Sequence, residues 1–74
     1  MTPTISALCL GGEWACAHGD FAGLRDVARR LEALVAAPIR DELRAVAEAC
    51  RDDVDRASAL WVVAERHVIG AARL

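Results

Sequence analysis

Residues 20–35, with the sequence DFAGLRDVARRLEALV, carry the clearest structural pattern in the chain. Their apolar positions recur at intervals of three and four residues and are Leu24, Val27, Ala28, Leu31, Leu34 and Val35. Charged side chains fill most of the other positions, and Asp26 and Arg30 lie one helical turn apart. This spacing predicts an amphipathic helix that buries one face and is capped at its start by Asp20.

A helix is also predicted before this segment. Thr2-Pro3-Thr4 offers a cap and a proline that fits the first helical turn, and His18-Gly19-Asp20 offers a stop. The apolar stripe between them consists of Ile5, Leu8, Gly12, Ala15 and Cys16. We interpret Gly11-Gly12, inside this pattern, as a place of close helix packing.

Two further helices are expected after residue 35. Pro38 cannot continue a helix, so the chain breaks there and a third helix restarts with Pro38 in its first turn. Asp52 or Asp53 then caps a fourth helix over Val54 to Ile69, for which Gly70 is the expected C-cap. We therefore predict one all-α domain over 1–74, with four short helices forming two αα-hairpins over 5–36 and 38–70.

Charge and hydropathy exclude several classes of partner. Nine arginines and no lysine stand against eleven acidic residues, which gives a formal net charge of -2. A nucleic-acid-binding domain normally carries a basic face, so no nucleic acid is expected. The apolar stretch from Ile5 to Leu10 has no basic residue before it, and no uncharged apolar run approaches the roughly 20 residues that cross a bilayer. We expect a soluble, cytoplasmic protein.

The cysteines and histidines define an alternative function. A small metal- or thiol-dependent protein would use a set of four residues, Cys9, Cys16, His18 and Cys50, with Glu13 and His67 as further candidates. An odd number of cysteines does not suit a disulfide framework, and zinc needs about four converging ligands. Residues two apart on a helix point about 200° from each other, which argues against a catalytic pair within the set. Reduced, buried thiols, no enzymatic activity and no cofactor are therefore expected, with His67 on the surface beside the helix end.

The two predicted hairpins align with each other at a shift of 33 residues. Each contains a helix, a tight acidic turn and a second helix, and the first turn is Gly19-Asp20-Phe21. With Gly12 seven positions earlier and Leu8 before it, this period and turn resemble the tetratricopeptide repeat. The resemblance implies stacked helical hairpins that bind protein partners, as in small bacterial secretion chaperones and adaptors. Leu24, where the family has Ala, departs from the pattern, and an ordinary four-helix bundle is the alternative.

The first and fourth helices are apolar over more of their circumference than one core requires. Leu10 and Trp14 lie on the flank of the first helix away from its stripe, and residues 60–63 are all apolar. Such surplus surface predicts a non-enzymatic interaction module that binds a partner helix or a second copy of itself. The expected interface residues are Leu10, Trp14, Leu60, Trp61 and Val63.

Overall fold

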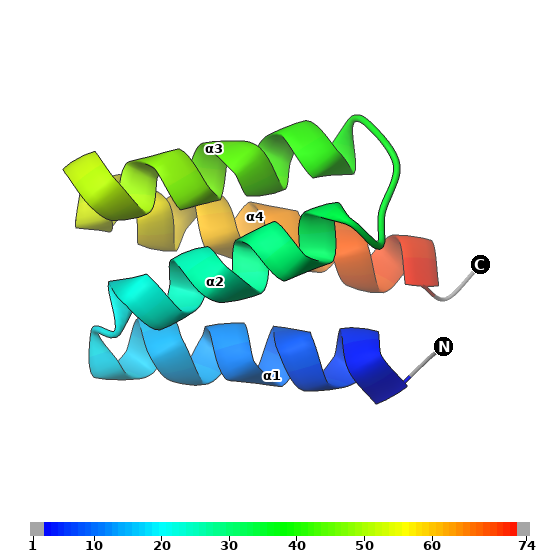
Figure 1. The fold of residues 1–74 in the computed structure, drawn as a ribbon, viewed down its shortest axis with the longest axis horizontal. Helices are drawn as coiled ribbons and strands as arrows, with labels where there is room; N and C mark the ends of the chain where they lie inside the picture. Colours follow the sequence, from blue (N-terminus) through cyan, green and yellow to red (C-terminus); the bar gives the residue numbers. More distant parts are fainter. Residues whose placement is uncertain (1–2, 73–74) are drawn as a thin grey trace.

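A computed structural model describes residues 3–72 of the chain, and all of its regular structure is helical. Its elements are α1 (Pro3–His18), α2 (Phe21–Glu32), α3 (Ile39–Asp52) and α4 (Val54–Ala72) (Figure 1). Consecutive helices pack side by side, whereas α1 and α4 touch each other more lightly. The start of α1, the end of α4 and the loop between α2 and α3 lie at one end of the bundle (Figure 1). The predicted all-α class is confirmed.

The turn between α1 and α2 has the geometry that its sequence predicts. Gly19 adopts a left-handed backbone with φ of 69°, a conformation that glycine adopts without steric cost. The Asp20 N–H donates to the Ala15 carbonyl at 2.8 Å, and the Gly19 N–H donates to the Cys16 carbonyl at 3.3 Å. These two bonds form a Schellman motif that satisfies carbonyls at the end of α1. The Asp20 carboxylate then accepts the Gly23 N–H at 2.9 Å and so caps α2.

Two helix boundaries beside the α2–α3 loop differ from the sequence prediction. The second helix ends at Glu32, before Leu34 and Val35, and its last turn tightens as the Ala33 N–H donates to the Arg30 carbonyl. Pro38 has no N–H to offer the Leu34 carbonyl, which prevents the α-helix from continuing. The third begins at Ile39, one residue after Pro38.

A third boundary also differs from the prediction, because Gly70 is not a C-cap. The helix α4 continues through Gly70 to Ala72, and the Gly70 backbone does not have the positive φ of a left-handed cap. Ala71 and Ala72 are strong helix formers, which favours this continuation. At the other end of α4, the Asp53 carboxylate accepts the Arg56 N–H at 3.1 Å, so Asp53 is the N-cap.

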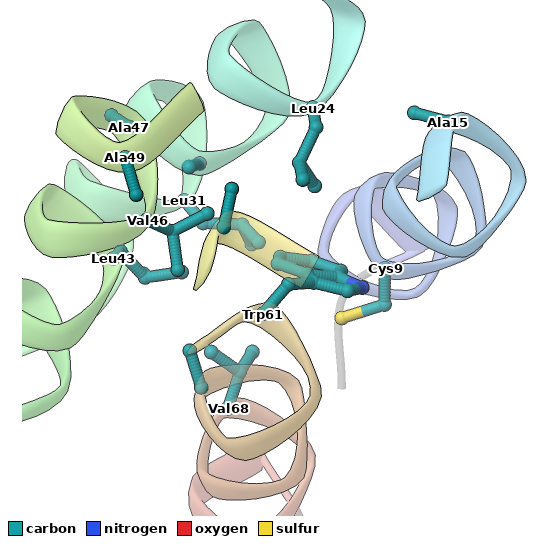
Figure 2. Packing of buried hydrophobic residues seen from close by; sticks show 13 residues of the cluster. Cys9, Ala15, Leu24, Leu31, Leu43, Val46, Ala47, Ala49, Trp61 and Val68 are labelled. Carbon is teal, nitrogen blue, oxygen red and sulfur yellow. The ribbon is translucent and has the colours of Figure 1, made fainter. Parts of the chain in front are cut away.

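The core is aliphatic apart from one tryptophan. Its largest fully buried side chains are Trp61, Leu24, Leu31, Leu43, Val46 and Val68. In Figure 2 the Trp61 indole extends from α4 toward α1, and its end lies near Cys9. Gly12 makes room for it, because a Cβ at Gly12 would lie 2.6 Å from Trp61 Cη2 and 2.8 Å from Trp61 Cε2. The expected close packing at Gly12 is therefore confirmed, and its partner is an indole ring.

Candidate interaction surface

The structure places the five predicted interface residues in three different environments. Leu10, Trp14 and Val63 are 64, 57 and 48% exposed, so three of the five lie on the surface. Leu60 is half-buried and packs against the core. Trp61 is 2% exposed, so its predicted place on a binding surface is wrong. The α4 residue that replaces it on the surface is Val62, which is 55% exposed.

The outer face of α1 is apolar and exposed. Ala7, Leu10, Trp14 and Ala17 lie within about 80° of one another around the helix axis, opposite buried Gly12. The described helix contains one charged side chain, Glu13. A helix that is apolar around its whole circumference is normally buried on all sides, whereas α1 packs on α2 and lightly on α4. Its outer face is thus available for another apolar surface.

The exposed indole of Trp14 is held in place by its own helix. Its ring stacks on the His18 ring with centroids 4.2 Å apart and planes 20° apart. The His18 Nδ1 in turn lies 2.9 Å from the Trp14 carbonyl oxygen. A large apolar side chain restrained in this way loses less conformational entropy when it enters an interface.

An apolar hollow of about 270 Å³ lies at the end of the bundle where α1 begins. Residues from α1, α3, α4 and the α2–α3 loop contribute to it, among them Ile5, Val35, Ile39 and Val68. A second hollow of about 410 Å³ lies on α4 alone, beside Val62 and Ile69. The exposed apolar surface of α1 and α4 is therefore divided into the outer face of α1 and separate hollows.

Two carboxylates meet where α1 and α4 approach each other. Burial raises the pKa of Glu65 above its ordinary value, and the nearby Glu13 carboxylate raises it further. The indole N–H of Trp61 is close enough to lower the pKa of Glu65, yet Trp61 Nε1 and Glu65 Oε2 are both buried without a hydrogen bond of good geometry. These polar groups make the contact between α1 and α4 less stable, since a buried polar group without a hydrogen-bond partner costs free energy.

Two of the three cysteines, Cys16 and Cys50, lie near each other. Burial raises the pKa of the Cys9, Cys16 and Cys50 thiols, as expected for largely apolar surroundings. Cys16 lies close enough to Cys50 to raise its pKa as well, whereas the Arg25 guanidinium lowers it. His18 is stacked on Trp14, and no group of three or more potential ligands is arranged around a metal position within residues 3–72.

His67 pairs with Glu42, a contact that the sequence pattern did not predict. His67 Nδ1 lies 2.5 and 2.8 Å from the two carboxylate oxygens of Glu42, which joins α4 to α3. His67 lies five residues before the end of α4, because the helix continues to Ala72. Its contact is therefore with a neighbouring helix and not with the expected helix end.

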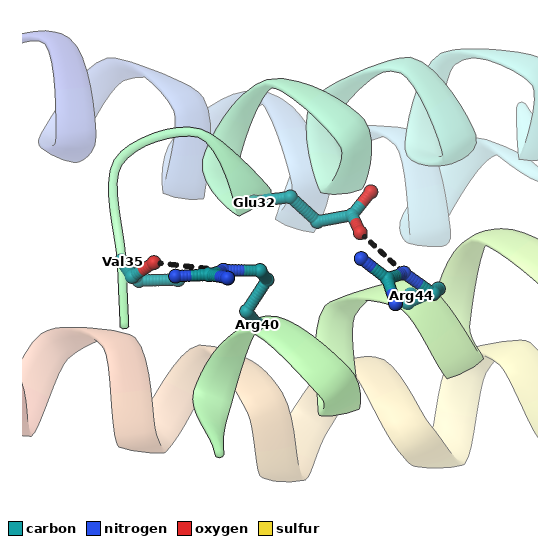
Figure 3. A network of polar contacts seen from close by, with 4 residues as sticks. All are labelled: Glu32, Val35, Arg40 and Arg44. Atoms are coloured by element: carbon teal, nitrogen blue, oxygen red, sulfur yellow. Dashed lines mark hydrogen bonds and ion pairs between the residues drawn. The ribbon is translucent and has the colours of Figure 1, made fainter. Parts of the chain in front are cut away.

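A polar hollow of about 340 Å³ lies between α2 and α3, along the charged flanks of the two helices. It is lined by Arg25, Arg29, Glu32, Arg44, Ala47, Glu48 and Arg51. At one end the Arg44 Nε lies 3.1 Å from Glu32 Oε1 (Figure 3). Beyond that pair the Arg40 Nε donates to the Val35 carbonyl at 3.5 Å.

The chain matches no protein-family model, no curated protein and no solved structure. Across residues 3–72, no helix combines the length and hydrophobicity that a membrane span requires. The resemblance to the tetratricopeptide repeat stays a prediction.

Proposed function

We propose that this protein is a small, non-enzymatic helical interaction module, adaptor- or chaperone-like, whose α1 outer face binds a partner helix. The observation that carries the proposal is the exposure of Leu10 and Trp14 on a helix with one charged residue. Exposed aromatic and aliphatic side chains of this size are typical anchors of protein interfaces. Val62 and Val63 on α4 are further exposed apolar side chains, separate from the α1 face.

The partner we propose is α1 of a second copy. In a two-fold contact each residue meets the same surface of the other copy, so a face with like charges would repel itself. The outer face of α1 has no charge at Ala7, Leu10, Trp14 or Ala17 and is free of that repulsion. Ala7 and Ala17 are small, which lets two helices approach closely around the larger anchors. A partner of opposite charge would find no complementary group on this face.

Molar mass in solution tests the proposal directly. Light scattering over a concentration series should give twice the 7.9 kDa of one chain, falling toward 7.9 kDa on dilution. Leu10→Ser should shift the midpoint of this transition to about tenfold or higher concentration, since burying a leucine contributes about 1.5–3 kcal/mol. Helix content by circular dichroism should be unchanged, because Leu10 lies outside the core.

Leu34→Ser is the matched control, because Leu34 is 47% exposed but lies in the α2–α3 loop. It should leave the mass transition where it is. A folded monomer at every concentration would refute self-association, and equal effects of the two substitutions would refute the assignment to α1. With a folded monomer, the partner of the α1 face would instead be an apolar helix from a different protein.

A further inference from the structure

We infer that the hollow between α2 and α3 binds a phosphate group of a small soluble molecule, held between Arg25 and Arg51. Four arginines and two glutamates line this hollow, an excess of two cations in a chain whose formal net charge is -2. The arginines that look evenly distributed along the sequence are thus gathered by the packing of two helices. The site is independent of the α1 surface and would be an additional function.

The register of the helices places two like charges opposite each other. The ion pair between Glu32 and Arg44 shows which residues of α2 and α3 face each other across the hollow. Because the two helices run in opposite directions, moving seven residues back along α2 and seven forward along α3 brings Arg25 opposite Arg51. Both residues line the same hollow, which agrees with this register.

Neither of these two arginines is paired directly with a carboxylate in the part of the chain that the structure describes. Within residues 3–72, neither Arg25 nor Arg51 forms an ion pair at 4.0 Å or less. Arg25 is half-buried, and its charge lowers the pKa of the Cys50 thiol beside Arg51. Facing guanidiniums repel each other unless an anion lies between them. An anion bound there would be stabilised by both walls of the hollow.

Phosphate is the anion that this arrangement suits best. A guanidinium donates two parallel hydrogen bonds to phosphate oxygens, and the chain uses arginine alone as its cationic residue. Two guanidiniums on opposite walls can each bind a pair of oxygens of one tetrahedral group, while Arg29 lies one turn from Arg25 on the same wall. Glu48 also lines the hollow, and its negative charge limits the affinity.

The test is a titration with inorganic pyrophosphate, followed by residue-resolved amide NMR shifts at constant ionic strength. Saturable shifts should concentrate at residues 25–29 and 48–51 with a Kd of about 1 mM or tighter. Arg25→Gln and Arg51→Gln should each weaken binding about tenfold, because each removes charge-assisted bonds. Glu48→Gln should strengthen binding, since it removes the opposing carboxylate. Arg66→Gln on α4 is the control and should change the Kd less than about twofold.

Several results would overturn the inference. Shifts that do not saturate, or that spread equally over arginines outside the hollow, would mean that the hollow is an ordinary solvated surface. An Arg66→Gln effect as large as that of Arg25→Gln would mean nonspecific charge attraction. Binding to vesicles that contain phosphatidic acid, without binding to soluble pyrophosphate, would refute a small soluble ligand. All four variants lie on exposed or half-buried positions, and unchanged circular dichroism would show that they remain folded.

Discussion

Two adjacent glycines in α1 should respond to the same substitution in opposite directions. A Cβ at Gly12 would lie 2.6 and 2.8 Å from two atoms of the buried Trp61 ring, whereas a Cβ at Gly11 would lie 3.7 Å from Val27 Cγ2. Alanine stabilises a helix by about 1 kcal/mol relative to glycine. Gly11→Ala should therefore raise the free energy of unfolding by up to about 1 kcal/mol.

Gly12→Ala gains the same helix propensity but must displace a rigid, fully buried indole. Overpacking a core costs about 1–3 kcal/mol, so after the gain in helix propensity the net effect should be a loss of up to about 2 kcal/mol. For a domain of this size each kcal/mol shifts the Tm by about 4–8 °C. Thermal and urea unfolding followed by circular dichroism, at one protein concentration, would measure both variants. If Gly12→Ala were as stable as Gly11→Ala, the seating of Trp61 against Gly12 would be refuted.

The remaining predictions concern stability and local environment. Trp61→Ala should lose about 3–5 kcal/mol and leave the chain largely unfolded, whereas Arg29→Ala should change stability by less than about 0.5 kcal/mol in the same urea titration. Trp61 as the sole tryptophan, in a Trp14→Phe variant, should emit at shorter wavelength than Trp14 alone in Trp61→Phe; similar spectra would contradict their different burial. The folded-state pKa of Glu65 is raised, so its stabilising protonated form is lost as pH rises through that pKa. Glu65→Gln should accordingly raise the Tm at neutral pH, with a gain that shrinks toward pH 4.5; a pH-independent gain would argue against the carboxyl titration.

The local features of the fold could be predicted because they depend on residues close in sequence. Gly19 and Asp20 end one helix and cap the next through bonds that span three to five residues. The Asp26–Arg30 ion pair at 3.1 Å is likewise a one-turn contact. Amphipathic patterns in α2 and α3 fix which side of each helix is buried, so their core residues follow from spacing.

Contacts between distant residues could not be predicted in the same way. The pairs Glu32–Arg44 and Glu42–His67 join residues 12 and 25 positions apart, and either depends on how two helices are placed against each other. The same applies to the gathering of Arg25 and Arg51 at one hollow, since their spacing along the chain gives no sign of it. A charge pattern on one helix indicates which of its faces is exposed. Which residue a charged side chain pairs with depends on how the helices pack.

The two tryptophans show where the sequence pattern is ambiguous. The α4 segment Leu60-Trp61-Val62-Val63 is apolar at every position, so its periodicity does not say which side chain points inward. Gly12 determines which of these side chains points inward. It has no side chain at the contact between α1 and α4, and the space that this leaves accommodates the Trp61 ring. Trp14 lies on the opposite side of α1 and has no such space.

Trp61 therefore belongs to the fold, whereas Trp14 belongs to the proposed interface. Gly12→Ala acts on the packing of α1 against α4 and should lower stability in the monomer, whereas Leu10→Ser acts on a face that the monomer leaves exposed. If α1 binds a second copy, Leu10→Ser should lower the mass measured by light scattering without lowering the Tm extrapolated to high dilution. A loss of monomer stability with Leu10→Ser as large as that with Gly12→Ala would instead place Leu10 in the core. Light scattering and thermal unfolding together therefore distinguish an interface on α1 from a helix whose outer side contributes to the monomer's own core.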